Sequence, residues 1–511
     1  MMGRKERRFA PLAHLSLEDL VPADHFYRLL DRTLDLSFVR ALVAPYYAAG
    51  GRPSIDPVVF FRLQLVLFFE DMRSERLLMR TLADRLAARW YVGYDIGEAL
   101  PDHSSLTKIR ERYGLETFQR FFDAIVEQCR VAGLVRGEEL YIDATKVMAN
   151  AAIDSVTPRF TVAARAHVDD LFALDQADEE VAGTAAPETE EEASLHPPER
   201  IGPAAAPVEE DLAATNAARH DWIAAHGRRD RTTLSPRFHR TADYLVSTTD
   251  PDATYMKQRG GLRLGYQDHD VVDGGPARII LTALVAPAEV AEDIPALDLL
   301  WHTRFRWRLR PRQATADKGY ATIAIIRTLE DQGLHAYLPL PEWNARGRFF
   351  PKDAFAYDAA RDVYTCPGDA TLRVSRLMKA ARVVLYRASA ATCAACVLRE
   401  RCTASTQGRS LSRNYDEEYL DRVRAYRATP PYKRALRKRQ VWVEPLFGEA
   451  KDWHGLRRFR LRRLWRVTSE ALLTAAGQNL KRLLSKWGWG RRPFPAAPAV
   501  AIGHLRPAFV V

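Results

Sequence analysis

Apolar residues recur at the spacing of α-helices through the first part of the chain, and we expect residues 1–137 to form an all-helical domain. Asp56, which is followed by Pro57, predicts an N-cap and a first helical turn. The run VVFFRLQLVLFF that begins after Pro57 is too apolar for a surface helix. Ser74 predicts the start of the next helix.

The segment LPDHSSLTKIRERYG predicts a further helix, with Asp102 or Ser104 as its N-cap and Gly114 as its end. Its basic residues are Lys108, Arg110 and Arg112. A helix–turn–helix with these side chains on its second helix could lie on DNA. The alternative is a helical packing domain with a solvated basic face.

Extended patterns begin after the helical region. Residues 138–148 predict a first strand, and three more extended runs lie at 243–250, 262–273 and 277–288, separated by turn residues. Helix, strand, helix and strand then alternate up to residue 341. Consecutive strands followed by strands that alternate with helices predict an α/β fold with a mixed sheet and crossover connections.

The length of 511 residues suggests about three domains. An Ala-, Pro- and Glu-rich stretch interrupts the strand pattern and has too few apolar residues to form a core. The expected organisation is a helical domain at 1–137, a first part of the α/β core at 138–341 with a flexible acidic insertion at about 150–240, a Cys-containing insertion at 342–428, a C-terminal helical part of the core at 429–490 and a tail at 491–511.

The formal net charge is +10, and it is unevenly distributed. Residues 175–211 hold twelve carboxylates against one arginine, so the rest of the chain has 74 basic and 53 acidic residues, a net charge of +21. Such a balance favours a polyanionic partner, and nucleic acid fits best. Neither a secretory signal nor a membrane-spanning run is visible, which predicts a cytoplasmic protein without a membrane partner.

Three carboxylates lie at the ends of predicted elements that are far apart in sequence. Asp143 lies in the first strand, Asp317 follows a later strand, and Glu444 precedes a basic, helix-forming stretch. Such residues can converge at the carboxyl end of a sheet, where ligands bind in α/β folds. Converging acids repel one another, and a divalent cation such as Mg²⁺ is the usual way in which they are tolerated.

Other acids are alternatives for this site. Glu449 could replace Glu444, although it lies on a different helix face from Lys451. Lys451 is seven residues after Glu444, about two helical turns, so it shares that residue's face and could contact a phosphate. Three more acids are either metal ligands or turn residues. They are Asp250, Asp268 and Asp270.

The region from residue 432 to residue 492 contains seventeen Lys or Arg and four acids, interleaved with aromatic residues. It is either a solvated basic helix or a surface that follows the phosphates of DNA. Besides Lys451, the candidate DNA-binding residues here are Arg437, Arg439, Arg457, Arg458, Arg460, Arg462 and Arg463.

Four of the five cysteines lie within the predicted insertion at 342–428. They are Cys366, Cys393, Cys396 and Cys402, and the middle two form a C-x2-C pair. This set suits a tetrahedral structural Zn²⁺, and reduced structural cysteines are the alternative. Cys129 stands apart and is expected in the core.

In their order along the chain, these motifs resemble those of the DDE transposases of bacterial insertion sequences. The resemblance is closest to the insertion-sequence 1182-like branch, which has a helical N-terminal domain and a Cys-containing insertion. The segments that carry it are PDHSSLTKIRERYG, YIDATKVMANA, STTDPDA, GYQDHDVVD, ADKGY, CAACVLRERC with GRSLSR, and VEPLFGEAK followed by NLKRL. Glu444 and Lys451 match a Glu-x6-Lys spacing.

The resemblance implies an RNase H-like core with Asp143, Asp317 and Glu444 as catalytic residues that bind Mg²⁺ or Mn²⁺. It implies cleavage at the terminal inverted repeats, attack of the freed 3′-hydroxyls on target DNA, and a homodimer or higher multimer on DNA. The family's Arg-x3-Glu step is not met, because position 440 is Gln, so Arg439 or Arg437 would serve instead.

Tyr432 and Arg434 are one residue short of the family's Tyr-x2-Arg pair, and the resemblance adds both to the DNA-binding candidates. Two alternative functions remain open. One is a metal-dependent RNase H-like nuclease that does not join DNA. The other is a DNA-binding protein with an inactive catalytic centre.

Overall fold

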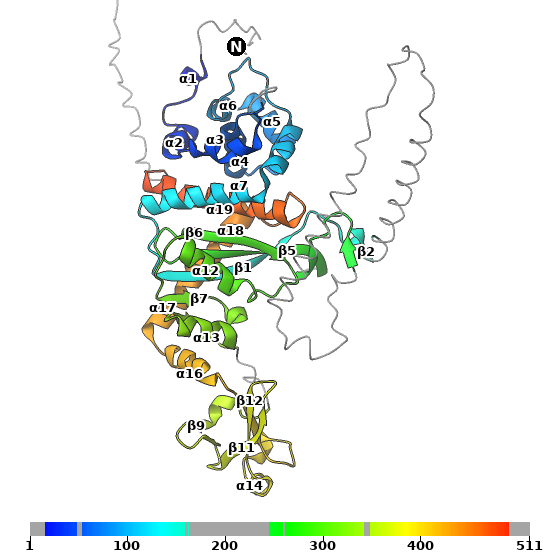
Figure 1. Cartoon of the computed structure of the whole chain (residues 1–511), viewed down its shortest axis with the longest axis vertical. Helices are drawn as coiled ribbons and strands as arrows, with labels where there is room; N and C mark the ends of the chain where they lie inside the picture. The colour runs from blue at the N-terminus through cyan, green and yellow to red at the C-terminus, as the bar shows by residue number, and fades with distance from the viewer. Residues whose placement is uncertain are drawn as a thin grey trace, which may run out of the picture.

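The computed structural model of the chain describes residues 16–48, 54–158, 162, 245–258, 261–341 and 348–489. Helices form one end of the long axis, a mixed sheet lies in the middle, and a smaller β unit forms the other end (Figure 1). Most of the predicted acidic insertion and the predicted tail lie outside the described residues.

The N-terminal helices are α1 (Leu17–Leu20), α2 (Phe26–Thr33), α3 (Phe38–Val43), α4 (Pro57–Phe69), α5 (Glu75–Asp84), α6 (Leu86–Val92) and α7 (His103–Val131). The predicted caps of α4 and α5 are confirmed, since Asp56 accepts the N–H of Val58 at 2.8 Å and Ser74 accepts the N–H of Leu77 at 3.3 Å. Helix α4 is buried along most of its length, as its apolar sequence predicts. None of the helices that the structure describes is both long and apolar enough to cross a membrane.

Helix α7 consists of two helices that meet at a kink. Asp102, rather than Ser104, is the N-cap of the first. Gly114 adopts φ +62° and ψ 179°, which is non-helical, so the first helix ends where the sequence predicts. Apolar residues at helical spacing return after the glycine and pack into the core, so a second helix, which was not predicted, continues to Val131.

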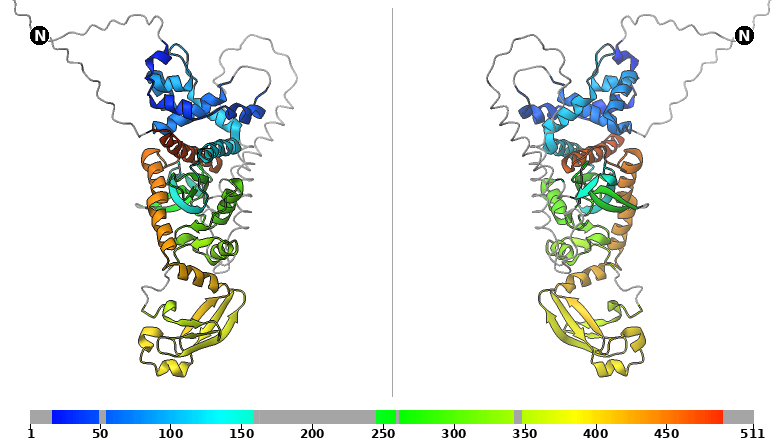
Figure 2. Two further views of the ribbon diagram at one scale, coloured as in Figure 1. Left: turned by 90° about the vertical axis from the view of Figure 1, so that its left-hand side faces the viewer. Right: turned by 90° about the vertical axis from the view of Figure 1, so that its right-hand side faces the viewer.

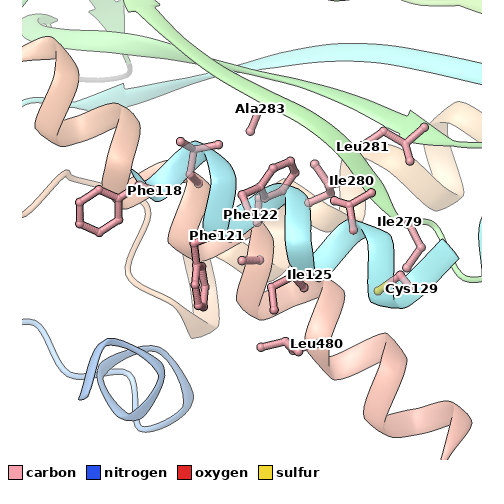
Figure 3. Close-up of a cluster of buried hydrophobic side chains, with 14 of the residues drawn as sticks. Phe118, Phe121, Phe122, Ile125, Cys129, Ile279, Ile280, Leu281, Ala283 and Leu480 are labelled. Carbon is pink, nitrogen blue, oxygen red and sulfur yellow. The ribbon is translucent and has the colours of Figure 1, made fainter. Parts of the chain in front are cut away.

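That packing joins the helical region to the sheet in one continuous core (Figure 3). Phe118, Phe121 and Phe122 of α7 lie beside Ile280 of the sheet and Leu480 of the C-terminal helix, and all five are fully buried. Fully burying a side chain of this size stabilises the fold by about 1.5–3 kcal/mol. The core therefore fixes the helices against the sheet.

The central sheet is built from β1 (Glu139–Met148), β4 (Thr254–Gln258), β5 (Gly261–Asp273), β6 (Ile280–Pro287), β7 (Gln313–Thr315) and β8 (His335–Tyr337). Strand β5 pairs with β1 along one edge and with β4 and β6 along the other. Strands β7 and β8 extend the sheet beyond β1 in parallel. The predicted mixed α/β sheet is confirmed, while β4 was not predicted. A separate pair, β2 (Val156–Pro158) and β3 (Leu245–Ser247), lies outside the sheet.

Helices cover both faces of the sheet (Figure 2). One face carries α12 (Ala296–Arg306) and α13 (Ile323–Asp331), and the other carries α17 (Pro430–Lys438) and α18 (Glu444–Trp453). Helix α19 (Leu464–Lys486) lies beside α7 along the β6 edge of the sheet (Figure 1). Asn479 of α19 bonds both the N–H and the C=O of Ile280 at 2.9 and 2.8 Å, so its side-chain amide takes the place of a neighbouring strand on β6. Helix α16 (Glu417–Tyr426) connects this region to the β unit.

The β unit is an antiparallel sheet, which the sequence analysis did not predict. Its strands are β9 (Ala356–Asp358), β10 (Val363–Thr365), β11 (Thr371–Met378), β12 (Val383–Arg387) and β13 (Ser410–Asn414), with the short helices α14 (Ala390–Ala394) and α15 (Arg399–Cys402). Its small core includes Tyr364, Leu372 and Tyr386. These strands are short and carry many exposed polar residues, so their sequence has little alternating pattern.

Candidate active site

Two of the predicted carboxylates are placed by neighbouring parallel strands. The last parallel pair of β1 and β7 is Tyr141 opposite Thr315. Asp143 and Asp317 each follow that pair by two residues, so they lie at the same level along the two strands. Asp143 stays inside β1, where it is paired with Asp270 of β5, whereas Asp317 lies beyond the end of β7. The Asp317 carboxylate accepts the N–H of Gly319 at 2.7 Å, which fixes the turn after β7. The two aspartates are therefore neighbours where β7 ends.

Glu444 reaches the same place from a helix with an unusual turn. Residues 439–443 form a π-helical turn, η5, between α17 and α18. Pro445 has no N–H to give to an α-helical bond, which favours a wider turn here. A π turn has its hydrogen bond between residues five apart, so Arg439 and Glu444 share one face although they are one residue too far apart for an α-helix. This geometry accommodates the missing Arg-x3-Glu step.

Arg439 joins two of the acids. Its guanidinium lies 2.8 Å from the Glu444 carboxylate and 3.3 Å from that of Asp143. Arg439 and Asp143 are 14% and 9% exposed at their side chains, whereas Glu444 is 49% exposed. Arg439 is thus the shared cationic partner of the mostly buried Asp143 and the half-exposed Glu444.

The carboxyl group of Asp143 shows the effect of this crowding. Burial raises its pKa to about 6, Arg439 opposes the rise, and the charges of Asp317 and Glu444 add to it. The three acids therefore act on one another electrostatically, although they are remote in sequence. A fourth acid, Glu292, was not predicted from the sequence. Its pKa is also raised, first by burial and then by the charges of Asp317 and Asp143.

Lys451 lies on the same face of the sheet, beside the acids. Its ammonium donates to the Thr145 hydroxyl at 2.5 Å, two residues along β1 from Asp143. Burial lowers the pKa of Lys451, while the charge of Asp268 opposes that change. A cation is thus held within reach of the acid site.

The alternative acid Glu449 has other partners. Its carboxylate binds Arg482 at 2.7 Å and pairs with Lys481 and with His454. These partners hold the pKa of Glu449 well below its usual range, against the effect of burial. Glu449 is therefore a structural ion-pair centre on the far face of α18 from Lys451.

Of the three remaining alternatives, Asp250 begins a turn, since its C=O accepts the N–H of Ala253 at 3.1 Å. Asp250 is fully buried and accepts the Tyr266 hydroxyl at 2.7 Å and the N–H of Arg463 at 2.9 Å, which anchors the start of α19. Asp268 and Asp270 lie inside β5, so the turn interpretation was wrong for them. Burial raises the pKa of Asp268 to about 7, and burial with the charges of Asp268 and Asp143 raises that of Asp270.

The donor set suits a hard divalent cation. Asp143, Asp317 and Glu444 offer only carboxylate oxygens, the ligands that Mg²⁺ and Mn²⁺ prefer. Burial is the main cause of the raised pKa of Asp143, and the charges of Asp317 and Glu444 add to it. Among the described residues, however, no three acid, His or Cys side chains already lie close enough together to hold one ion. Binding therefore requires a small rearrangement of these side chains around Arg439.

The most basic part of the chain is a loop and not a helix. Residues 454–463, here named the basic loop, connect α18 and α19 without helical structure. Phe459 is fully buried, its N–H bonds the C=O of Met148 at 2.9 Å, and Glu470 accepts the N–H of Arg460 at 3.0 Å. The backbone of the loop is thus fixed against the end of β1.

The predicted DNA-binding residues divide by exposure. Five are exposed, namely Arg434, Arg437, Arg457, Arg458 and Arg462. Tyr432 is 5% exposed and packs against Tyr337, so its ring does not face a DNA surface and that prediction is corrected. Arg460 is engaged by Glu75 at 2.9 Å, and Arg463 is only partly exposed.

The candidate helix–turn–helix is also corrected at one residue. Arg110 is 2% exposed and pairs with Glu75 inside the helical domain. Burial lowers the pKa of its guanidinium, opposed by Glu75. Lys108 and Arg112 remain exposed. Glu75 therefore binds both Arg110 and Arg460, and it connects the helical domain to the basic loop.

Four cysteines meet in the β unit. Cys366, Cys393, Cys396 and Cys402 line one cavity of about 290 Å³. Backbone N–H groups of Ala370 and Arg409 point at the sulfurs of Cys366 and Cys393 at 3.3 and 3.4 Å. In the described conformation the sulfurs do not yet enclose a metal position. Cys129 is fully buried in the core, as predicted.

Comparisons with known proteins add two family matches. Residues 15–112 match the family described as Transposase domain (DUF772), and residues 365–484 match that described as Transposase DDE domain. The second range contains Glu444, while Asp143 and Asp317 lie between the two ranges. No curated protein matches the chain.

Among solved structures, one similar chain is in the cryo-EM structure of a piggyBac transposase synaptic complex with hairpin DNA. It is 10% identical, and the likeness covers 91% of this chain and 75% of that one. The TM-score is 0.33, which is too low to support an argument.

Proposed function

We propose that the chain is an insertion-sequence DDE transposase, which its two transposase family matches support, and that Asp143, Asp317 and Glu444 are its catalytic carboxylates. One observation carries the assignment. The three acids come from β1, the turn after β7 and α18, yet the charges of Asp317 and Glu444 both raise the pKa of Asp143. Assignment to the insertion-sequence 1182-like branch stays a prediction.

The strand order supports an RNase H-like core. Strands β6, β5 and β1 are antiparallel neighbours, and β7 and β8 continue in parallel beyond β1. Asp143 on the central strand and Asp317 after its parallel neighbour then lie at the position where ligands bind in α/β sheets. The expected divisions at residues 137, 341, 428 and 490 are kept as proposed domain boundaries.

The reaction is hydrolysis of a phosphodiester at each element end, followed by attack of the freed 3′-hydroxyl on target DNA. When bound, Mg²⁺ or Mn²⁺ would activate the attacking oxygen and stabilise the leaving oxygen. Arg439 keeps the Asp143 and Glu444 carboxylates oriented toward each other. Lys451, held by Thr145, is placed to contact a phosphate beside the cleaved bond.

The basic loop supplies the DNA surface next to this site. Its exposed arginines are Arg457, Arg458 and Arg462, and Arg434 and Arg437 lie on α17. Because the loop backbone is fixed by Met148 and Glu470, these side chains have a defined base from which to reach phosphates. We include a homodimer or higher multimer on DNA in the proposal, since two element ends must be held together.

The four cysteines of the β unit are proposed to hold a structural Zn²⁺. Support comes from their common cavity and from the N–H groups directed at Cys366 and Cys393, which would stabilise thiolates. The zinc content of purified protein tests this. We expect about one Zn²⁺ per chain in the wild type and a clear loss in Cys393→Ser, whereas Cys129→Ser keeps it. A zinc-free wild type would favour reduced structural cysteines.

Cleavage and joining are tested with a labelled DNA duplex that carries the element's ends. Asp143→Asn, Asp317→Asn and Glu444→Gln should each abolish cleavage and leave DNA binding intact, while Glu138→Gln, which changes an exposed acid, should cleave normally. Cleavage without strand transfer in the wild type would favour the nuclease alternative. A wild type that binds DNA but never cleaves it would favour the inactive DNA-binding protein.

A further inference from the structure

Glu292 lies in the loop that connects β6 and α12. Strands β6, β1 and β7 point in the same direction, because β5 is antiparallel to both β1 and β6 and β7 is parallel to β1. The loop after β6 and the turn after β7 therefore emerge at the same end of the strands, their carboxyl end. Glu292 is half-buried there, and the charge of Asp317 contributes to its raised pKa after burial.

Gly319 shows how close the two acids come. A β-carbon on Gly319 would lie 2.9 Å from the Oδ1 atom of Asp317 and 3.2 Å from the Oε2 atom of Glu292. Both carboxylates therefore face the same small space above the glycine. The backbone of Gly319 lies outside the left-handed region, so a side chain there meets no conformational strain, but the two carboxylates would have to shift to make room for it.

A second observation concerns the buried hydroxyl group of Tyr320. Tyr320 is 1% exposed, and its hydroxyl has no hydrogen-bond partner among the residues that the structure describes. Its pKa is raised by burial and then by the charges of Asp143, Glu292 and Asp317. The hydroxyl thus lies near all three acids without bonding any of them. A buried, unsatisfied donor costs about 1–3 kcal/mol, and a ligand in the site would relieve that cost.

We propose that Glu292 is a fourth carboxylate of the cation site, opposite Asp317 across Gly319, and that the Tyr320 hydroxyl bonds a water or carboxylate oxygen of the occupied site. The inference rests on the proposed function, since it adds a ligand to the same centre. Two aspartates and a half-exposed glutamate leave positions for further oxygen ligands around a hard cation. Glu292 would fill one of these positions from the side of Gly319.

The test measures Mn²⁺ affinity of the full-length protein by isothermal titration calorimetry, without DNA. Glu292→Gln keeps the size of the side chain and removes its charge, and it should weaken Mn²⁺ binding about tenfold or more. The matched control is Glu138→Gln, which changes an exposed glutamate at the other end of β1 and should bind as the wild type does. Circular dichroism of each variant checks that it is folded.

Two further variants test the space above Gly319 and the hydroxyl group of Tyr320. Gly319→Ala places a methyl group between the Asp317 and Glu292 carboxylates and should weaken Mn²⁺ binding as Glu292→Gln does. Tyr320→Phe should weaken it less, because it removes only a hydrogen bond.

Wild-type affinity in Glu292→Gln overturns the inference, and if Asp143→Asn has then lost Mn²⁺ binding, the proposed function stands without it. A wild type that binds no Mn²⁺ overturns the inference and the proposed catalytic centre together.

Discussion

Two glutamates on helix α18 have opposite surroundings. Glu449 is paired with Lys481, Arg482 and His454, and these partners hold its pKa well below the usual range. Glu444 shares a single partner, Arg439, with Asp143. A structural acid is thus matched by fixed cations, whereas the acid site keeps more negative charge than its side chains neutralise. The excess charge is what a divalent cation would compensate.

The largest expected effect separates the two glutamates by activity. Glu444→Gln should lower the cleavage rate by about 10³-fold or more, because a cation in such a site supplies several kcal/mol of transition-state stabilisation. Glu449→Gln should retain cleavage wherever the protein is folded. A single-turnover cleavage assay at 25 °C measures both. Equal losses of cleavage rate in the two variants would contradict the distinction between a catalytic Glu444 and a structural Glu449.

The next effect is on stability, and here the loss is expected for Glu449→Gln. Glu449→Gln leaves Arg482 and Lys481 without their carboxylate and should cost about 2–3 kcal/mol, below the ~3–5 kcal/mol of a fully buried pair. The pKa of Glu449 is lowered on folding, so this stability is present above its unfolded pKa and is lost only as pH falls through the lowered value. Urea unfolding at pH 7 measures the cost. No loss at pH 7 would contradict the structural role.

Asp143→Asn should stabilise the metal-free protein. The pKa of Asp143 is raised on folding to about 6, so the cost of its charge builds up as pH rises from its unfolded pKa near 4, is complete above about 6, and is absent below the unfolded pKa. A gain of roughly 1–2 kcal/mol is therefore expected at pH 8, and none at pH 3.5. Unfolding curves in EDTA at the two pH values measure it. A loss of stability at pH 8 would contradict the excess-charge account.

The smallest effect concerns the basic loop. Arg458→Ala should weaken DNA binding several-fold and lower the salt slope by about 1, because Arg458 is exposed. Arg460→Ala should instead reduce stability, since Arg460 pairs with Glu75, which also binds the buried Arg110. Fluorescence anisotropy over a salt series, with urea unfolding, separates the two. Unchanged DNA affinity in Arg458→Ala would remove it from the DNA surface.

The parts of this fold that the sequence predicts are those specified locally. Asp56 and Ser74 cap their helices as expected, β1 contains Asp143, and β7 ends two residues before Asp317. The π turn was not predicted, although its signals were present: Pro445 and one extra residue between Arg439 and Glu444.

What the sequence does not predict depends on tertiary packing. The mid-strand acids Asp268 and Asp270 are tolerated because a buried carboxyl group can stay protonated, which no local pattern indicates. Glu292 has only a weak signal, an acid in the loop after a strand. Its proximity to Asp317 arises from the order of β6, β1 and β7.

The central claim is that Asp143, Asp317 and Glu444 together hold a divalent cation. Anomalous diffraction from crystals grown with Mn²⁺ tests it most directly. We predict an anomalous peak at about 2.0–2.5 Å from carboxylate oxygens of Asp143 and Asp317, with Glu444 turned toward it and none at Glu449. Crystals that bind Mn²⁺ elsewhere, with Arg439 still between Asp143 and Glu444 and no peak there, would contradict it.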